Sequence, residues 1–216
     1  MTPVLILASV FAIFIPALML PGPDFIAVVR SSMIRGTAAG LMTTLGVTLG
    51  LGFYASLSLL GLSAVLAEYQ WLAWTVRVLG GCYLIYLGIR LFLASRGKPE
   101  EIVIESACEQ PGRPRGNPLL FGFLVTLTNP KAIVLFASVF APAVTTGTPL
   151  WFMGLMVALV MASSLIWYSI VSLFMSSGPV MRRFRNAQHW IERLAGVCFV
   201  AIGGRILADA RNPVTP

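Results

Sequence analysis

Charged residues are scarce in this sequence. Lysine, arginine, aspartate and glutamate together account for 11% of its 216 residues, whereas soluble domains carry about 25%. Hydrophobic residues make up 57% and come in long runs, several of which reach the ~20 residues that a membrane-spanning helix needs. So little charge cannot cover a surface exposed to water. The composition therefore excludes a soluble domain and predicts an all-α integral membrane protein.

Histidine and cysteine are also scarce. The sequence has one histidine, His189, and three cysteines, of which Cys82 and Cys198 lie inside hydrophobic runs and Cys108 lies between two runs. No CxxC motif or Cys/His cluster is present, which argues against a structural zinc site or a disulfide framework. No nucleotide-binding loop and no catalytic cluster occur inside the runs. We therefore expect neither an enzyme nor a cofactor.

Six hydrophobic segments are present, and each is a predicted membrane-spanning helix. Polar residues concentrate between the segments, above all between positions 95 and 117. This stretch divides the chain into a first three-helix repeat at 1–94, a cytoplasmic loop at 95–117 and a second three-helix repeat at 118–216. The six segments are 4–30, 38–66, 71–94, 118–142, 149–176 and 191–209.

Nine of the 15 lysines and arginines lie in alternate connections between these segments, and the net charge of the chain is +7. Connections with lysine and arginine stay in the cytoplasm, so the first, third and fifth connections are predicted inside and both termini outside. The charge is therefore attributed to membrane orientation and not to nucleic-acid binding. The basic residues concerned are Arg30, Arg35, Arg96, Lys98, Arg113, Arg115, Arg182, Arg183 and Arg185.

The third and sixth segments resemble each other at one constant spacing. The match indicates that the chain consists of two related three-helix units. Because three is an odd number, the second unit would be inverted in the membrane, an architecture known from transporters. The recurring residues are Trp74 and Trp190, Arg77 and Arg193, Gly80 and Gly196, Cys82 and Cys198, and Gly88 and Gly204.

A break is predicted in the first helix, where Pro21, Gly22 and Pro23 precede Asp24. Proline removes a backbone hydrogen-bond donor and clashes with the preceding turn. In hydrocarbon, such a break persists only where it is buried in protein or lines a cavity. Asp24 follows the break directly, and a carboxylate at this depth marks a candidate functional residue.

A second break is predicted in the fourth helix at Asn129, Pro130 and Lys131. Asparagine is a favoured N-cap and proline is favoured at the first helical position, so a new half-helix is expected to begin here. Its partial positive end would point into the membrane, and Lys131 adds a full charge to the same turn. Together they predict an anion site suited to a carboxylate.

Asp24 and Lys131 together suggest a binding site for a small zwitterion. Asp24 could bind an ammonium group, carry a proton or pair with Lys131, and a static ion pair between the two is the alternative to a substrate role. Further polar candidates lie on the second and fifth helices, although each could bond to its own helix backbone. These candidates are Thr43, Thr44, Thr48, Ser163, Ser164 and Tyr168.

Small residues on the second helix have a structural interpretation. Gly46 and Gly50 form a GxxxG pattern, and such a pattern allows two helices to approach closely in a membrane. We therefore expect these glycines to serve packing and not to contact a solute.

The two breaks, the six segments and the basic middle loop resemble the lysine-exporter superfamily, and within it most closely the homoserine/threonine exporter (LysE/RhtB) branch. The resemblance covers nearly the whole chain. It implies proton-driven export of amino acids or their derivatives across the bacterial inner membrane. The resemblance does not fix the oligomeric state of the protein, and a homodimer is one option. The residues that carry it are Pro21, Gly22, Pro23, Asp24, Asn129, Pro130 and Lys131.

Two alternative functions are considered. Relatives in the wider superfamily pass thiol–disulfide equivalents with cysteines on the first and fourth helices, and this chain has no cysteine in either. A transporter of another small solute or of an ion would fit the same architecture. Export by alternating access, in which the two units rock about the broken helices, is the preferred hypothesis.

Overall fold

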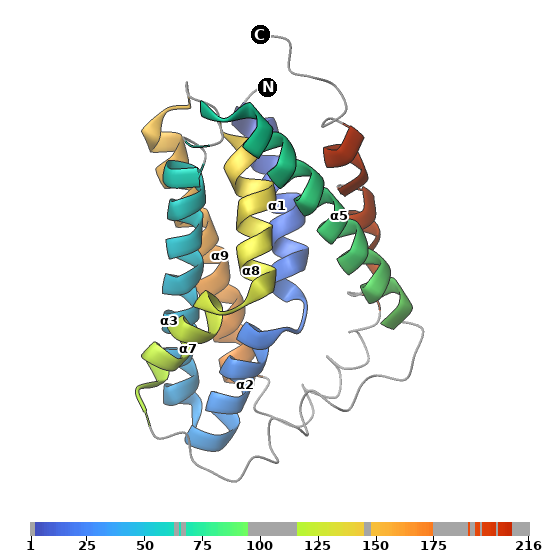
Figure 1. The fold of residues 1–216 in the computed structure, drawn as a ribbon. Helices are drawn as coiled ribbons and strands as arrows, with labels where there is room; N and C mark the ends of the chain where they lie inside the picture. The colour runs from blue at the N-terminus through green and yellow to red at the C-terminus, as the bar shows by residue number, and fades with distance from the viewer. Residues whose placement is uncertain are drawn as a thin grey trace.

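The computed structural model describes residues 3–62, 65, 68–94, 116–144, 148–174, 190, 193–194, 196–201 and 203–208. Every element within these ranges is helical (Figure 1). The elements are α1 (Pro3–Met19), α2 (Pro23–Arg35), α3 (Thr37–Ser56), the π-helical η1 (Leu57–Leu62), α5 (Gln70–Ala94), α7 (Pro118–Leu127), α8 (Pro130–Leu135), the π-helical η2 (Phe136–Phe140), the 3-10 turn η3 (Ala141–Ala143) and α9 (Leu150–Phe174). A shorter apolar helix spans Gly196–Ala208.

Helix α3 packs against α2, α7 and α9. Its glycines allow the close approach to α7: a Cβ atom placed on Gly46 would lie 2.0 Å from the carbonyl oxygen of Leu119, and one on Gly50 would lie 2.7 Å from the Cβ of Thr126. Side chains larger than hydrogen do not fit between these backbones. The packing role predicted for the two glycines is confirmed.

Both predicted breaks are present. The axes of α1 and α2 differ by 43°, and those of α7 and of the helix Pro130–Phe140 differ by 54°. Helix α2 restarts at Pro23 after an extended Gly22. Helix α8 restarts at Pro130, and the Asn129 side chain accepts a hydrogen bond from the backbone N–H of Lys131 at 3.0 Å. Proline at the first position and asparagine at the cap are thus used as the sequence predicted.

One predicted boundary is wrong. The first segment was expected to end near position 30, with Arg30 and Arg35 in the connection that follows. Helix α2 instead continues to Arg35, and the chain turns at Gly36 alone, whose φ of 89° lies in the left-handed region. Glycine enters this region without steric cost, so a single residue ends one helix and begins α3. Both arginines therefore lie within the last turns of α2.

The structure supports fewer spans than the six predicted. Two helices are long and apolar enough to cross a membrane on their own, Thr37–Gly61 and Leu150–Phe174. The count rises to four if each bent pair forms one span. These observations concern the described residues. The spans predicted at 71–94 and 191–209, and the inverted repeat, stay predictions.

The two segments that resemble each other in sequence lie side by side (Figure 1). A Cβ atom on Gly88 of α5 would meet the carbonyl oxygen of Gly196 at 2.6 Å, and one on Gly203 would meet that of Gly81 at 2.7 Å. The residue order of these contacts makes the two helices antiparallel. Small residues let them approach closely, as expected for helices in a membrane.

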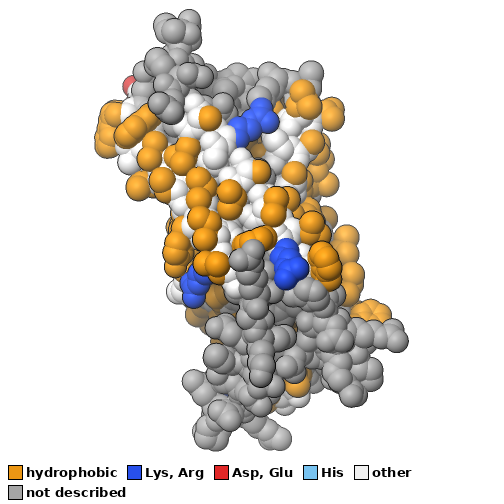
Figure 2. All heavy atoms as spheres, turned by 90° about the vertical axis from the view of Figure 1, so that its right-hand side faces the viewer, with side chains coloured by type: hydrophobic (Ala, Val, Ile, Leu, Met, Phe, Trp, Pro, Cys, Tyr) orange, Lys and Arg blue, Asp and Glu red, His pale blue; other side chains and the backbone are white. Residues whose placement is uncertain are grey.

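Many large apolar side chains are exposed on the described part of the chain. Figure 2 shows one such face, where hydrophobic side chains dominate the described surface and basic groups are scattered. Large exposed apolar areas are incompatible with water and suit a lipid environment. The chain is therefore a multi-pass membrane protein. Exposed large residues on α9 include Leu150, Trp151, Leu155, Leu165, Ile166, Ile170, Leu173 and Phe174.

Several predictions fall outside the described residues. They are the loop from 95 to 115, Cys108, His189 and the basic cluster Arg182, Arg183 and Arg185. The division into repeats at 1–94 and 118–216 also stays a prediction.

Candidate functional site

Asp24 lies at the point where the two broken helices meet. It sits in the first turn of α2 and is 6% exposed. The Nδ2 of Asn129 donates to its Oδ2 at 2.9 Å, and the Oγ1 of Thr126 donates to its Oδ1 at 3.0 Å. Thr126 precedes the second break, and Asn129 lies in it as the N-cap of α8. The Asp24 carboxyl group thus connects the end of α7 to the cap of α8.

Lys131 makes the reverse connection. It lies in the first turn of α8, and its Nζ donates to the carbonyl oxygen of Leu20 at 3.4 Å. Leu20 precedes the first break and is free to accept because the helix ends there. Asp24, in the first turn after the first break, therefore contacts residues at the second break. Lys131, in the first turn after the second break, contacts the residue before the first break. Within the described residues, the donors that contact Asp24 are neutral and Lys131 donates to a backbone carbonyl.

A cavity of about 20 Å³ lies between the two breaks. A volume of ≳10–15 Å³ holds one water molecule, so this conformation has room for about one water and not for an amino acid. Charged and polar groups occupy one part of the wall and apolar side chains the rest. The cavity is lined by Phe14, Ala17, Leu18, Asp24, Leu51, Asn129, Lys131, Ala132, Leu135 and Tyr168.

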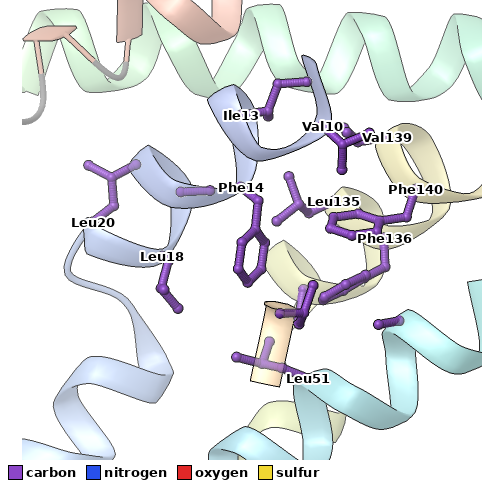
Figure 3. Packing of buried hydrophobic residues seen from close by; sticks show 14 of the residues in the cluster. Val10, Ile13, Phe14, Leu18, Leu20, Leu51, Leu135, Phe136, Val139 and Phe140 are labelled. Atoms are coloured by element: carbon purple, nitrogen blue, oxygen red, sulfur yellow. The ribbon is translucent and has the colours of Figure 1, made fainter. Parts of the chain in front are cut away.

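Phe14, Phe136 and Phe140 belong to one cluster of buried hydrophobic residues (Figure 3). Phe14 of α1 lines the cavity and meets Phe140 edge-on at 5.7 Å between ring centroids, and it lies 6.0 Å from Phe136. Phe136 also stacks on Tyr54 at 6.2 Å. The Tyr54 hydroxyl donates to the carbonyl oxygen of Leu127 at 2.6 Å, just before the second break. Rings at such distances pack favourably, and Phe14 joins this cluster to the wall of the cavity.

The polar candidates on α3 and α9 separate into two groups. Tyr168 lines the cavity. Thr43, Ser163 and Ser164 bond to their own helix backbone, as their alternative interpretation predicts; Ser164, for example, donates to the carbonyl of Val160 at 2.6 Å. Thr44 instead donates to the carbonyl of Tyr168 on the neighbouring helix at 3.2 Å. Thr48 Oγ1 is buried and has no hydrogen-bond partner among the described residues. Tyr168 is therefore the candidate of this set that reaches the site.

Sequence reasoning missed Thr126. It is fully buried, lies in the last turn of α7 and bonds directly to Asp24. A threonine in an apolar helix usually bonds to its own backbone, so its type gives no signal. Its position one turn before the Asn129–Lys131 break could have drawn attention to it.

The two described cysteines lie apart from this site. Both are free; Cys82 is exposed on α5, and Cys198 is half-buried in the Gly196–Ala208 helix. Neither lines the cavity. Their positions give no support to a thiol–disulfide role at the broken helices.

Comparison with known proteins places this architecture in a family. The LysE type translocator family matches residues 15–210. The chain is 31% identical over 195 residues to the threonine efflux protein of Escherichia coli K12, covering 90% of this chain and 94% of that protein. It is 31% identical over 197 residues to the threonine efflux protein of Salmonella typhi, with the same coverage.

A further relative is an uncharacterized membrane protein of Haemophilus influenzae, 32% identical over 203 residues, with 91% of this chain and 93% of that protein covered. No solved structure matches the chain. A match over almost the full length, with both helix breaks inside it, shows the family. The chain belongs to the LysE type translocators, and it is a membrane transporter and not an enzyme.

Proposed function

We propose that this protein is a proton-driven exporter of small amino acids in the bacterial inner membrane, working by alternating access. One observation carries the proposal: Asp24 and Lys131, of opposite charge, line one cavity between two broken helices. Ionisable groups at this depth cost about 2.5–3.5 kcal/mol each on insertion scales, which favours a functional reason for keeping them. The names of the threonine efflux relatives suggest the class of solute.

The two charges match the two ends of an amino acid. The ammonium group would bind the free lone pairs of the Asp24 carboxylate, beside the hydrogen bonds from Thr126 and Asn129. The carboxylate would bind at the start of the helix Pro130–Phe140, where the positive end of the helix dipole and Lys131 lie together. Tyr168 adds a hydroxyl to the same wall.

Coupling to protons follows from the chemistry of one carboxyl group. Protonated Asp24 has no negative charge to offer an ammonium group, so a proton and the solute compete for it. A proton that enters from outside would release the solute there, and loss of that proton to the cytoplasm would restore the binding form. Each side of the membrane thus favours a different occupant.

Alternating access requires the cavity to open. At about 20 Å³ it holds no amino acid in this conformation. The bends of 43° and 54° at the breaks provide hinges between short rigid helices. We propose that α1 and η2 separate at the Phe14–Phe140 contact to open one side. With the basic connections in the cytoplasm and both termini outside, this is the external side.

Export is tested by growth and by vesicle transport. A strain that overexpresses the protein should resist some members of a panel of toxic amino acids and analogues. Inside-out vesicles should take up radiolabelled L-threonine when a proton gradient is imposed. Asp24→Asn should abolish this uptake while membrane insertion is unchanged, and Lys131→Ala should weaken it.

Two outcomes would contradict the proposal. Wild-type gradient-driven uptake by Asp24→Asn would remove the proton role of the carboxyl group. Equal competition by free and carboxyl-amidated threonine against uptake by the wild-type protein would remove the anion site at Lys131. Arg35→Ala is a matched charge control, because Arg35 contacts the carbonyl oxygen of Gly116 at 2.9 Å outside the cavity.

A further inference from the structure

Thr126 lies between two hydrogen-bond acceptors. Its Oγ1 is 3.0 Å from Asp24 Oδ1 and 3.2 Å from the carbonyl oxygen of Gly122, one turn earlier in α7. A threonine hydroxyl has a single proton to donate, so it can serve only one of these acceptors at a time. The site therefore has two hydrogen-bond arrangements, which differ by a rotation of the hydroxyl hydrogen.

The rest of the Thr126 side chain is held by α3. Gly50 approaches so closely that a Cβ atom on it would lie 2.7 Å from the Cβ and 2.8 Å from the Cγ2 of Thr126. The methyl group thus packs against a backbone, and the residue is fully buried. Close packing on one side leaves the hydroxyl directed at Asp24 and Gly122.

The charge of Asp24 decides which arrangement is favoured. The ionised carboxylate only accepts, and a charge-assisted hydrogen bond is stronger than a neutral one, so it takes the hydroxyl proton of Thr126. A protonated Asp24 must instead donate. Asn129 presents an NH₂ group to it, and the Asn129 oxygen already accepts from the backbone N–H of Lys131. Thr126 Oγ1 is then the acceptor, and its own proton turns to Gly122.

We propose that Thr126 is the positioning residue of Asp24: it holds the ionised carboxylate ready for the ammonium group of the solute and accepts a hydrogen bond from the protonated form. The transport part of this inference rests on the proposed function. Within the described residues, the other titratable side chains that line the cavity with Asp24 are Lys131 of α8 and Tyr168 of α9.

The hydrogen bond itself is tested without any solute. Infrared difference spectra of the purified protein between alkaline and acidic pH should contain the carbonyl stretch of protonated Asp24, identified by its loss in Asp24→Asn. Thr126→Val keeps the shape and removes the hydroxyl, so this band should move to higher wavenumber. Thr126→Ser should restore the wild-type band. A band unchanged in Thr126→Val overturns the inference.

The positioning role is tested by L-threonine uptake into inside-out vesicles. Thr126→Val should raise KM about tenfold or more with Vmax little changed, because a hydrogen bond to a charged group is lost. Thr126→Ser should restore KM. Thr128→Val is the matched control, since Thr128 is exposed and its hydroxyl bonds to the carbonyls of Leu124 and Val125 in its own helix.

The outcomes separate this inference from the proposed function. Wild-type kinetics in Thr126→Val, or a lower Vmax with unchanged KM, overturns the positioning role of Thr126. Loss of uptake in Asp24→Asn would still support proton-coupled export. A Thr126→Ser variant as impaired as Thr126→Val shows that the methyl packing matters and not the hydroxyl, which also overturns the role. Wild-type uptake by Asp24→Asn removes the proposed coupling, and the positioning role in transport is lost with it.

Discussion

Removal of the Asn129 side chain should be much more costly than removal of a comparable helix cap. Asn129 makes two contacts: its Oδ1 caps α8 by accepting from the N–H of Lys131 at 3.0 Å, and its Nδ2 donates to Asp24 at 2.9 Å. Asn117 provides a matched control. It caps α7 by accepting from the N–H of Leu119 at 3.0 Å, it is exposed, and it lies outside the cavity.

The two contacts allow the magnitude to be worked out. Loss of an asparagine cap costs about 1 kcal/mol, and loss of a hydrogen bond to a charged group costs about 1.5–3 kcal/mol. Asn117→Ala should therefore destabilise the protein by about 1 kcal/mol, and Asn129→Ala by roughly 2.5–4 kcal/mol. Asn129→Ser should fall between them, because a serine hydroxyl can cap the helix and is too short to reach Asp24.

Unfolding in mixed micelles with increasing SDS measures these differences in free energy. Vesicle uptake measured in parallel should be lost in Asn129→Ala and kept in Asn117→Ala. Equal destabilisation by the two alanine variants would refute the reasoning, because it would mean that the contact between Asn129 and Asp24 contributes nothing to the folded state.

Two further predictions concern packing and the cavity wall. Gly46→Ala should destabilise the protein by about 1–3 kcal/mol, because the new methyl group meets the Leu119 backbone. The control Gly154→Ala, with no atom near the new Cβ, should be neutral or stabilising in the same SDS unfolding assay. Equal destabilisation by the two variants would contradict the packing argument. Tyr168→Phe should change stability by less than ~1.5 kcal/mol and raise the KM for L-threonine. The control Tyr86→Phe, on an exposed residue of α5, should leave KM unchanged. An unchanged KM in Tyr168→Phe would show that the Tyr168 hydroxyl does not bind the solute.

The breaks were predictable because proline acts locally. Pro23 and Pro130 are the first residues of α2 and α8, and each follows a residue with an extended backbone, Gly22 or Asn129. Pro16, by contrast, lies inside α1. The cap at Asn129 follows from the same local chemistry. The end of α2 is not predictable from its arginines, because Arg30 and Arg35 lie within the helix and Gly36, with its positive φ, is the residue that turns the chain.

The composition of the site was predictable only in part. Asp24, Asn129 and Lys131 stand out because charged and polar residues are rare in this chain. Their pairing does not follow from their types. A direct ion pair between Asp24 and Lys131 was one alternative, yet the described contacts join Asp24 to Asn129 and Thr126, and Lys131 to a backbone carbonyl.

The sequence by itself determined the membrane environment, the helical class and the two interruptions, because hydrophobicity and proline geometry act through the nearest neighbours in the chain. Only the tertiary structure decided which residues at one helix break contact which residues at the other. Thr126 contacts Asp24, which lies 102 positions away in the sequence. Gly50 allows α3 to pack closely against the Thr126 side chain. Contacts of this kind depend on how closely two backbones approach, and that distance is set by the packing of the whole bundle.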